Sequence, residues 1–239
     1  MAVEPKAVTS REFVRQFKAE IAAHHKLRVN HPFVKAIGEG KVSMDHLREW
    51  VRQDYKFRNI VPRIAMMRYL ACSDEEIARR LYEVVEEETE GLSTGSAGHI
   101  DLFVQFAAAL GISREELDAA PLAPATAAHL YYVELVIHKY PWFVVMAAQI
   151  AAEGTAPPPM AALAKGLVAN YDLSPEAVRF FTVHVDADED HGTLAEEIAE
   201  RYLQSPALQD QTREVGFRRL ELLYDTWTID GFALASRRP

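Results

Sequence analysis

Two histidines and an aspartate lie at helical spacing in the run His184-Val-Asp-Ala-Asp188-Glu-Asp-His191. At about 100° of rotation per residue, Asp188 lies roughly 40° from His184, and His191 lies roughly 20° to the other side. The remaining acids of the run turn to other faces, as expected of a solvated surface. Neutral imidazole and carboxylate together suit iron, manganese or zinc, and this mixed ligand set favours iron where oxygen chemistry is intended. We therefore expect a metal site on this stripe.

A second group of acids, Glu86-Glu87-Glu88-Thr89-Glu90, precedes a glycine-rich break. A run of acids is usually a solvated helix face, and this interpretation suits most of the group. Leu81 and Val84 mark the apolar stripe of the same expected helix. Glu88 follows them by seven and four residues, so periodicity favours Glu88 slightly as an inward-facing carboxylate, with Glu87 at the border of the stripe.

Glu153 ends the unusually apolar segment from Trp142 to Ala152. A carboxylate in such surroundings is costly unless it is paired, protonated or bound to a metal. The alternative is that Glu153 protrudes from a frayed helix end, beside Gly154 and the three prolines that follow. Spacing alone leaves both interpretations open.

Arginines and aromatic side chains supply candidates for holding a substrate. An arginine fork binds a carboxylate with two hydrogen bonds, so Arg58, Arg63 and Arg68 could clamp an acid. Surface charge explains each of them at least as well, and aromatic residues at helical spacing more often belong to the core. The predicted substrate-binding residues are Tyr55, Arg58, Arg63, Tyr132 and Trp142.

The elements that must position these residues are all expected to be helices. The three-and-four spacing of apolar residues recurs along the chain, whereas the alternation typical of strands is hardly seen. Capping boxes at Thr9, Ser73 and Ser113, and the pair Ser174-Pro175, mark helix starts. Pro62 is expected to kink one helix. The predicted helices span about 10–28, 44–70, 74–90, 99–110, 125–139, 141–153, 159–170, 175–203 and 207–229.

Composition restricts the kind of partner and the compartment. The chain has 239 residues without a linker-like tract, which predicts a single domain over 1–239. A net charge of −9 argues against nucleic acid and favours a small-molecule partner. One cysteine excludes an internal disulfide, the N-terminus lacks a signal-peptide profile, and the apolar run at 143–152 is too short to span a bilayer. We expect a cytoplasmic protein with no membrane partner.

Several of these motifs resemble the haem-oxygenase-like di-iron oxidases, a group related to the thiaminase-like TenA proteins and pyrroloquinoline quinone synthase. Asn30-His31-Pro32-Phe33 and Trp50-Val-Arg-Gln-Asp54-Tyr55 are similar to the opening helices of the wider superfamily. Glu86-Glu87-Glu88, His99-Ile-Asp-Leu-Phe and Phe180-Phe-Thr-Val-His184 resemble the di-iron branch, which includes the chlamydial death-domain-associating protein. The resemblance covers most of the chain.

The resemblance implies a fold, a ligand set and a reaction class. The chain would fold as a TenA-like seven-helix bundle and form a homodimer. Each chain would bind two iron ions and use dioxygen as a co-substrate. It would oxidise an amino acid, a fatty acid or a related carboxylate by N-oxygenation, carbon–carbon cleavage or desaturation, and manganese could replace one iron. No catalytic residue beyond the ligands is implied. The implied metal ligands are Glu87, His99, Glu153, His184, Asp188 and His191.

Two departures from the family pattern leave more than one interpretation open. The segment from Gly91 to Gly98 is longer than usual, so Glu88 or Glu90 could replace Glu87 as the ligand. Asp54 and Tyr55 also match the thiaminase-like hydrolases, but the nucleophilic cysteine of that branch is missing. The same fold would also suit a cofactorless oxidase or a non-catalytic binding protein, because a fold does not decide a function.

Overall fold

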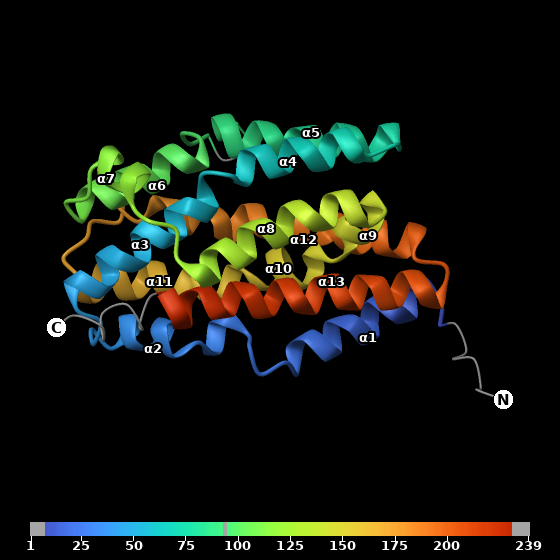
Figure 1. Cartoon of the computed structure of the whole chain (residues 1–239), viewed down its shortest axis with the longest axis horizontal. Helices are drawn as coiled ribbons and strands as arrows, with labels where there is room; N and C mark the ends of the chain where they lie inside the picture. The colour runs from blue at the N-terminus through green and yellow to red at the C-terminus, as the bar shows by residue number, and fades with distance from the viewer. Residues whose placement is uncertain (1–7, 93–94, 231–239) are drawn as a thin grey trace.

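The computed structural model describes residues 8–92 and 95–230, without the side chains of 186–191 and 229–230, and the described part is helical throughout (Figure 1). This confirms the predicted fold class. The helices are α1 (Ser10–Ala22), α2 (Pro32–Gly38), α3 (Met44–Arg58), α4 (Val61–Ala71), α5 (Glu75–Glu90), α6 (His99–Ala109), α7 (Arg114–Ala119), α8 (Pro124–Lys139), α9 (Trp142–Ala147), α10 (Gln149–Ala152), α11 (Pro157–Asn170), α12 (Arg179–Tyr202) and α13 (Pro206–Asp225). Short turns of 3-10 helix, η1 (Arg28–Asn30) and η2 (Glu153–Thr155), and a π-helical turn, η3 (Thr226–Asp230), connect or extend them.

Several expected helices are broken into shorter ones, so the expected count of seven is only approximate. The segment 44–70 divides into α3 and α4, because Pro62 lies in the first turn of a new helix instead of kinking a continuous one. Proline is tolerated there since it has no N–H to leave unsatisfied. The segment 141–153 likewise divides into α9, α10 and η2.

Side-chain caps explain several of the helix starts. The Thr9 side chain accepts a hydrogen bond from Glu12 N–H, and Ser113 with Glu116 forms a complete capping box. The start expected at Ser73 is wrong by one residue, because Asp74 caps α5 by accepting from two backbone N–H groups. The start expected at Ser174-Pro175 is also displaced: α12 begins only at Arg179.

Helix α12 lies at the centre of the bundle, with α1, α6, α9 and α11 packed against it. The hairpin of α4 and α5 forms one outer layer, and α13 lies with α1 toward the opposite side (Figure 1). An aromatic core that includes Phe33, Trp50, Phe103 and Phe181 fixes α2, α3, α6 and α12 against one another. No helix of the described part has both the length and the apolar character that a bilayer crossing needs.

Candidate metal centre

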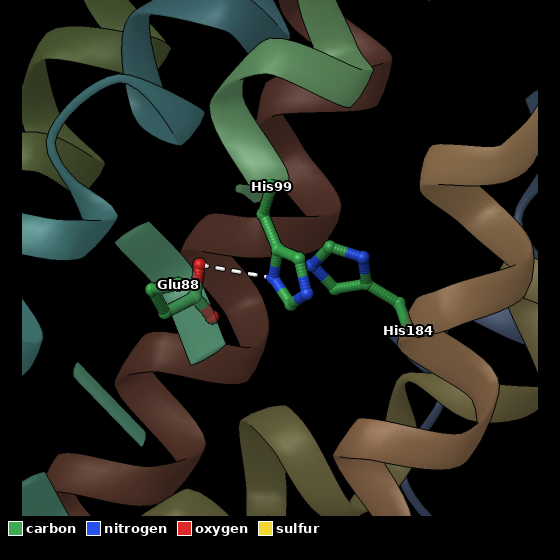
Figure 2. A group of neighbouring side chains, drawn as sticks. All are labelled: Glu88, His99 and His184. Atoms are coloured by element: carbon green, nitrogen blue, oxygen red, sulfur yellow. Dashed lines mark ion pairs between the residues drawn. The ribbon is translucent and has the colours of Figure 1, made fainter. Parts of the chain in front are cut away.

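Three side chains from three different helices converge at one buried point. Glu88 of α5, His99 of α6 and His184 of α12 each expose 7% or less of their surface. Each offers one ligand atom, and these atoms all lie within 4.8 Å of one another. Figure 2 shows the two imidazole rings side by side, with the Glu88 carboxylate beside His99. Glu88, which periodicity favours, is therefore the acid of α5 that completes this group.

His99 lies between two buried carboxylates. Its Nε2 is 3.0 Å from Oε1 of Glu87, and its Nδ1 is 3.1 Å from Oε2 of Glu88. Burial favours the neutral imidazole, but Glu88 and Glu87 outweigh it and raise the pKa of His99 above its ordinary value. Two carboxylates beside one buried imidazole also favour a metal cation at this point.

A backbone hydrogen bond fixes the orientation of the His184 ring. Nδ1 of His184 lies 2.7 Å from the carbonyl oxygen of Phe180, one turn earlier in α12. When Nδ1–H donates to this carbonyl, the lone pair is on Nε2. Metal-binding histidines are commonly held in this way, by a second nitrogen that donates to a carbonyl or carboxylate.

The distances within this group fit a metal ion. Nitrogen and oxygen ligands bind at about 2.0–2.2 Å, so two ligands at a right angle on one ion lie roughly 3.0 Å apart. The His99 and Glu88 atoms match this separation at 3.1 Å. The His99 Nδ1 atom is buried, and its contact with Glu88 lacks the geometry of a hydrogen bond. An ion between the two groups would satisfy this nitrogen, and two nitrogens with one oxygen form a donor set that iron accepts.

A tight junction of two glycines brings α5 and α6 to the site. Gly91 ends α5 in the left-handed conformation, with φ of 65°, which other residues rarely adopt. Gly98 precedes His99 directly, and a Cβ at this position would lie only 2.1 Å from the carbonyl oxygen of Thr89. The missing side chain of Gly98 therefore allows the backbone approach that places His99 beside Glu87 and Glu88.

Gly98→Ala should consequently displace His99 and weaken iron binding at the site. Overpacking of this kind costs about 1–3 kcal/mol of stability. Thermal denaturation and iron titration measure the two effects. Gly38→Ala is the matched control, because a Cβ at Gly38 has no neighbour within 4 Å. A Gly98→Ala protein that binds iron like the wild type would contradict this role for the junction.

A cavity of about 60 Å³ adjoins the converging side chains. Glu88 and His184 line it on one side, and apolar residues such as Ile64, Val133 and Met160 line much of the rest. Its charged residues also include four arginines, Arg28, Arg58, Arg68 and Arg219. Arg28 and Arg219 are not among the predicted substrate-binding residues. Arg28 lies outside the long helices, and Arg219 directly follows Arg218 on α13.

Glu153 lines the same cavity but is held by arginine. Its Oε1 is 2.9 Å from Nη1 of Arg68 and 3.7 Å from Nη2 of Arg219. The side chain is only 20% exposed, so Glu153 does not protrude freely. It is also not a member of the cluster of Glu88, His99 and His184. Pairing with a cation is one of the ways in which a carboxylate becomes tolerable in apolar surroundings.

The structure brings only Arg58 of the predicted substrate-binding residues to the cavity. Arg58 pairs with Asp54 at 2.9 Å. The remaining four lie elsewhere, because they already serve the fold or the surface. Tyr55 donates to Asp118 within the core, Arg63 pairs with Glu134 at the surface, Tyr132 packs in the core formed by α1, α8 and α13, and Trp142 donates to Ser73 near α5.

Two predicted ligands, Asp188 and His191, have side chains outside the described residues. Their backbone lies in α12, as the helical spacing predicts. Glu90 is exposed at the end of α5, so it is the acid of this group least suited to the buried site.

Comparisons with known proteins point to one family. Residues 48–224 match the model of a family described as iron-containing redox enzymes. The matched segment contains the helices that carry Glu88, His99, Glu153 and His184. This bears out the resemblance of the sequence motifs.

Relatives and solved structures agree with this match. The chain is 26% identical over 179 residues to a 4-aminobenzoate synthase of Chlamydia pneumoniae, covering 75% of this chain and 77% of that protein. It is 27% identical over 228 residues to a 4-aminobenzoate synthase of Nitrosomonas europaea, covering 89% and 88%. The crystal structure of a TenA homologue from Pseudomonas syringae pv. tomato has the same fold, with a TM-score of 0.75 at 18% identity over 94% of this chain and 91% of that one.

Proposed function

Because the chain belongs to the family of iron-containing redox enzymes, we propose that it is a non-haem di-iron oxygenase or oxidase. Its substrates would be dioxygen and a small carboxylate, such as an amino acid or a derivative of one. The observation that carries this proposal is the convergence of Glu88, His99 and His184 beside a cavity. A buried carboxylate is costly unless it is paired or bound to a metal, and the two imidazoles beside Glu88 supply further ligand atoms.

The residues that would hold the iron come from three helices, α5, α6 and α12, and from one turn, η2. Glu88, His99 and His184 form the described centre. Glu87, Glu153, Asp188 and His191 are the further candidates, and a second ion requires ligands from among them. Bound iron supplies the activation of dioxygen, whereas the protein supplies ligation, orientation and exclusion of water. The apolar cavity wall and the closed packing of α5, α6 and α12 serve the last of these tasks.

The names of the relatives suggest the class of carboxylate. Two of them are named 4-aminobenzoate synthase, so their named product carries a carboxylate and an amino group. We extend to this chain only the carboxylate of that named product, because the arginines of the cavity suit an acid. An amino-substituted acid satisfies both the names and the arginines of the cavity.

A thiaminase-like hydrolase is a weaker candidate for this chain. Cys72 is the single cysteine of the sequence, and it lies between α4 and α5, outside the cavity lining. Burial raises the pKa of the Cys72 thiol, which disfavours the thiolate that a nucleophile needs. The cavity therefore has no cysteine with which to perform such hydrolysis.

Dioxygen uptake tests the proposed function directly. Iron-loaded protein should consume dioxygen when amino acids, aromatic carboxylates and fatty acids are supplied in turn, with at least one of them oxidised. The same protein loaded with zinc should consume none, because zinc has no redox chemistry. Equal substrate conversion by the iron-loaded and the metal-free protein would overturn the proposal.

A further inference from the structure

Buried arginines line the cavity beside the metal centre. Among its described lining residues, four carry guanidinium groups and two, Glu88 and Glu153, carry carboxylates. Arginine cannot lose its proton in a protein, and burying its charge is costly without a counter-ion. Asp54 compensates Arg58 at 2.9 Å. Glu153 in turn lies within ion-pair distance of both Arg68 and Arg219.

Glu153 shows where a carboxylate sits in this cavity. Arg68 of α4 and Arg219 of α13 approach the same oxygen, Oε1, from two helices that are far apart in sequence. Arg28 lies next to this pair, since its Nη2 donates to the carbonyl of Ala152 at 2.9 Å. The side chains of Arg68 and Arg219 are only 10% and 7% exposed. Two arginines from α4 and α13 thus hold one carboxylate position, and Arg28 of η1 lies beside it.

Glu153 lies on a shorter element than Arg68 and Arg219, the two arginines that bind it. It opens η2, a single 3-10 turn that follows the four-residue helix α10. Its side chain is more exposed than those of the two arginines that bind it. A ligand that competes for Arg68 therefore displaces a side chain on a short turn and leaves the packed helices in place.

We propose that Arg68 and Arg219, with Arg28 beside them, form the binding site for the carboxylate of the substrate, and that Glu153 occupies this site until the substrate displaces it. The inference rests on the proposed function for its claim that the ligand is a substrate. The displaced Glu153 lines the same cavity as Glu88 and His184 and becomes available as a metal ligand. This accounts for a residue that the sequence resemblance assigns to the metal and that the structure pairs with arginine.

Binding of carboxylates to metal-free protein tests the proposal without relying on iron chemistry. Isothermal titration with acetate, benzoate and succinate should detect at least one ligand, and the matching uncharged amide should bind at least about tenfold more weakly. Arg68→Gln should weaken carboxylate binding by about tenfold or more. Glu153→Gln should strengthen it, because the internal competitor has lost its charge.

Arg63→Gln is the matched control, since Arg63 lies on the same helix as Arg68 but at the surface, paired with Glu134. Carboxylate binding should be unchanged in this variant. The opposite signs expected for Arg68→Gln and Glu153→Gln keep the test decisive even if one variant folds poorly. Equal affinity for acid and amide, no binding of any of the three acids, or weaker binding by Glu153→Gln would overturn the proposal. Iron binding and dioxygen uptake are separate measurements, so a failure here is distinguishable from a failure of the proposed function.

Discussion

His99→Ala is expected to abolish iron binding at the proposed centre and the dioxygen chemistry that depends on it. The His99 ring contacts Glu87 and Glu88 and lies tilted against the His184 ring, with ring centroids 4.4 Å apart. Its removal takes away one ligand and leaves two buried carboxylates without their shared partner. Removing a residue that only hydrogen-bonds to a metal ligand lowers metal affinity about 10- to 100-fold. Because His99 would be a direct ligand, we expect its loss to lower iron affinity by at least about 100-fold.

The same substitution should also destabilise the metal-free protein. Removing one partner of a buried ion pair costs about 3–5 kcal/mol, and chemical denaturation of the metal-free variant measures this loss. His138→Ala is the control, because His138 is exposed at the end of α8 and surface substitutions usually change stability by less than about 0.5 kcal/mol. A His99→Ala protein that keeps wild-type iron affinity would show that the metal lies elsewhere.

Glu88→Gln and Glu87→Gln should have clearly different effects on iron affinity. Glu88 shares one compact group with His99 and His184 and lines the cavity, whereas the contact described for Glu87 is with the Nε2 atom of His99. Each substitution keeps the shape of the side chain and removes its charge. We expect more than about 100-fold weaker iron binding for Glu88→Gln, which removes a direct ligand, and about tenfold weaker binding for Glu87→Gln, which removes a partner of a ligand.

Competition with a chelator of known affinity gives both constants under identical conditions. The two variants are each other's control, since they lie side by side on α5, are both buried, and leave His99 one remaining carboxylate. The reverse order of effects would return the ligand role to Glu87, which is the assignment that the sequence resemblance implies.

Sequence periodicity predicts the parts of the site that lie within regular helices. The inward position of Glu88 follows from its spacing to Leu81 and Val84, and α5 does present Glu88 to the core. His99 and His184 likewise lie on the buried faces of α6 and α12. The helical repeat predicts the inward face for Glu88 and a shared stripe for His184, whereas the position of His99 also depends on the close approach of α5 and α6 at Gly98.

The parts of the site that depend on contacts between distant segments are not predictable in this way. Glu153 lies beside Arg68 because α4 and η2 meet in the folded chain, across 85 residues of sequence. Arg219 approaches from α13, and nothing in its local sequence distinguishes it from Arg218. The sequence predicts Tyr55 and Trp142 in the pocket, yet each has a hydrogen-bond partner away from it, Asp118 and Ser73 respectively. Such partners depend on how helices pack, which periodicity within one helix does not specify.

Direct location of iron in the folded protein is the most decisive measurement for the proposed metal centre. Crystals grown without dioxygen and with iron(II) can be measured at the iron absorption edge, where anomalous scattering marks each iron ion. We expect a peak at bonding distance from Glu88, His99 and His184, inside the bundle between α5, α6 and α12. Iron found only at surface carboxylates, with these three side chains unchanged and no peak between them, would contradict the proposed centre.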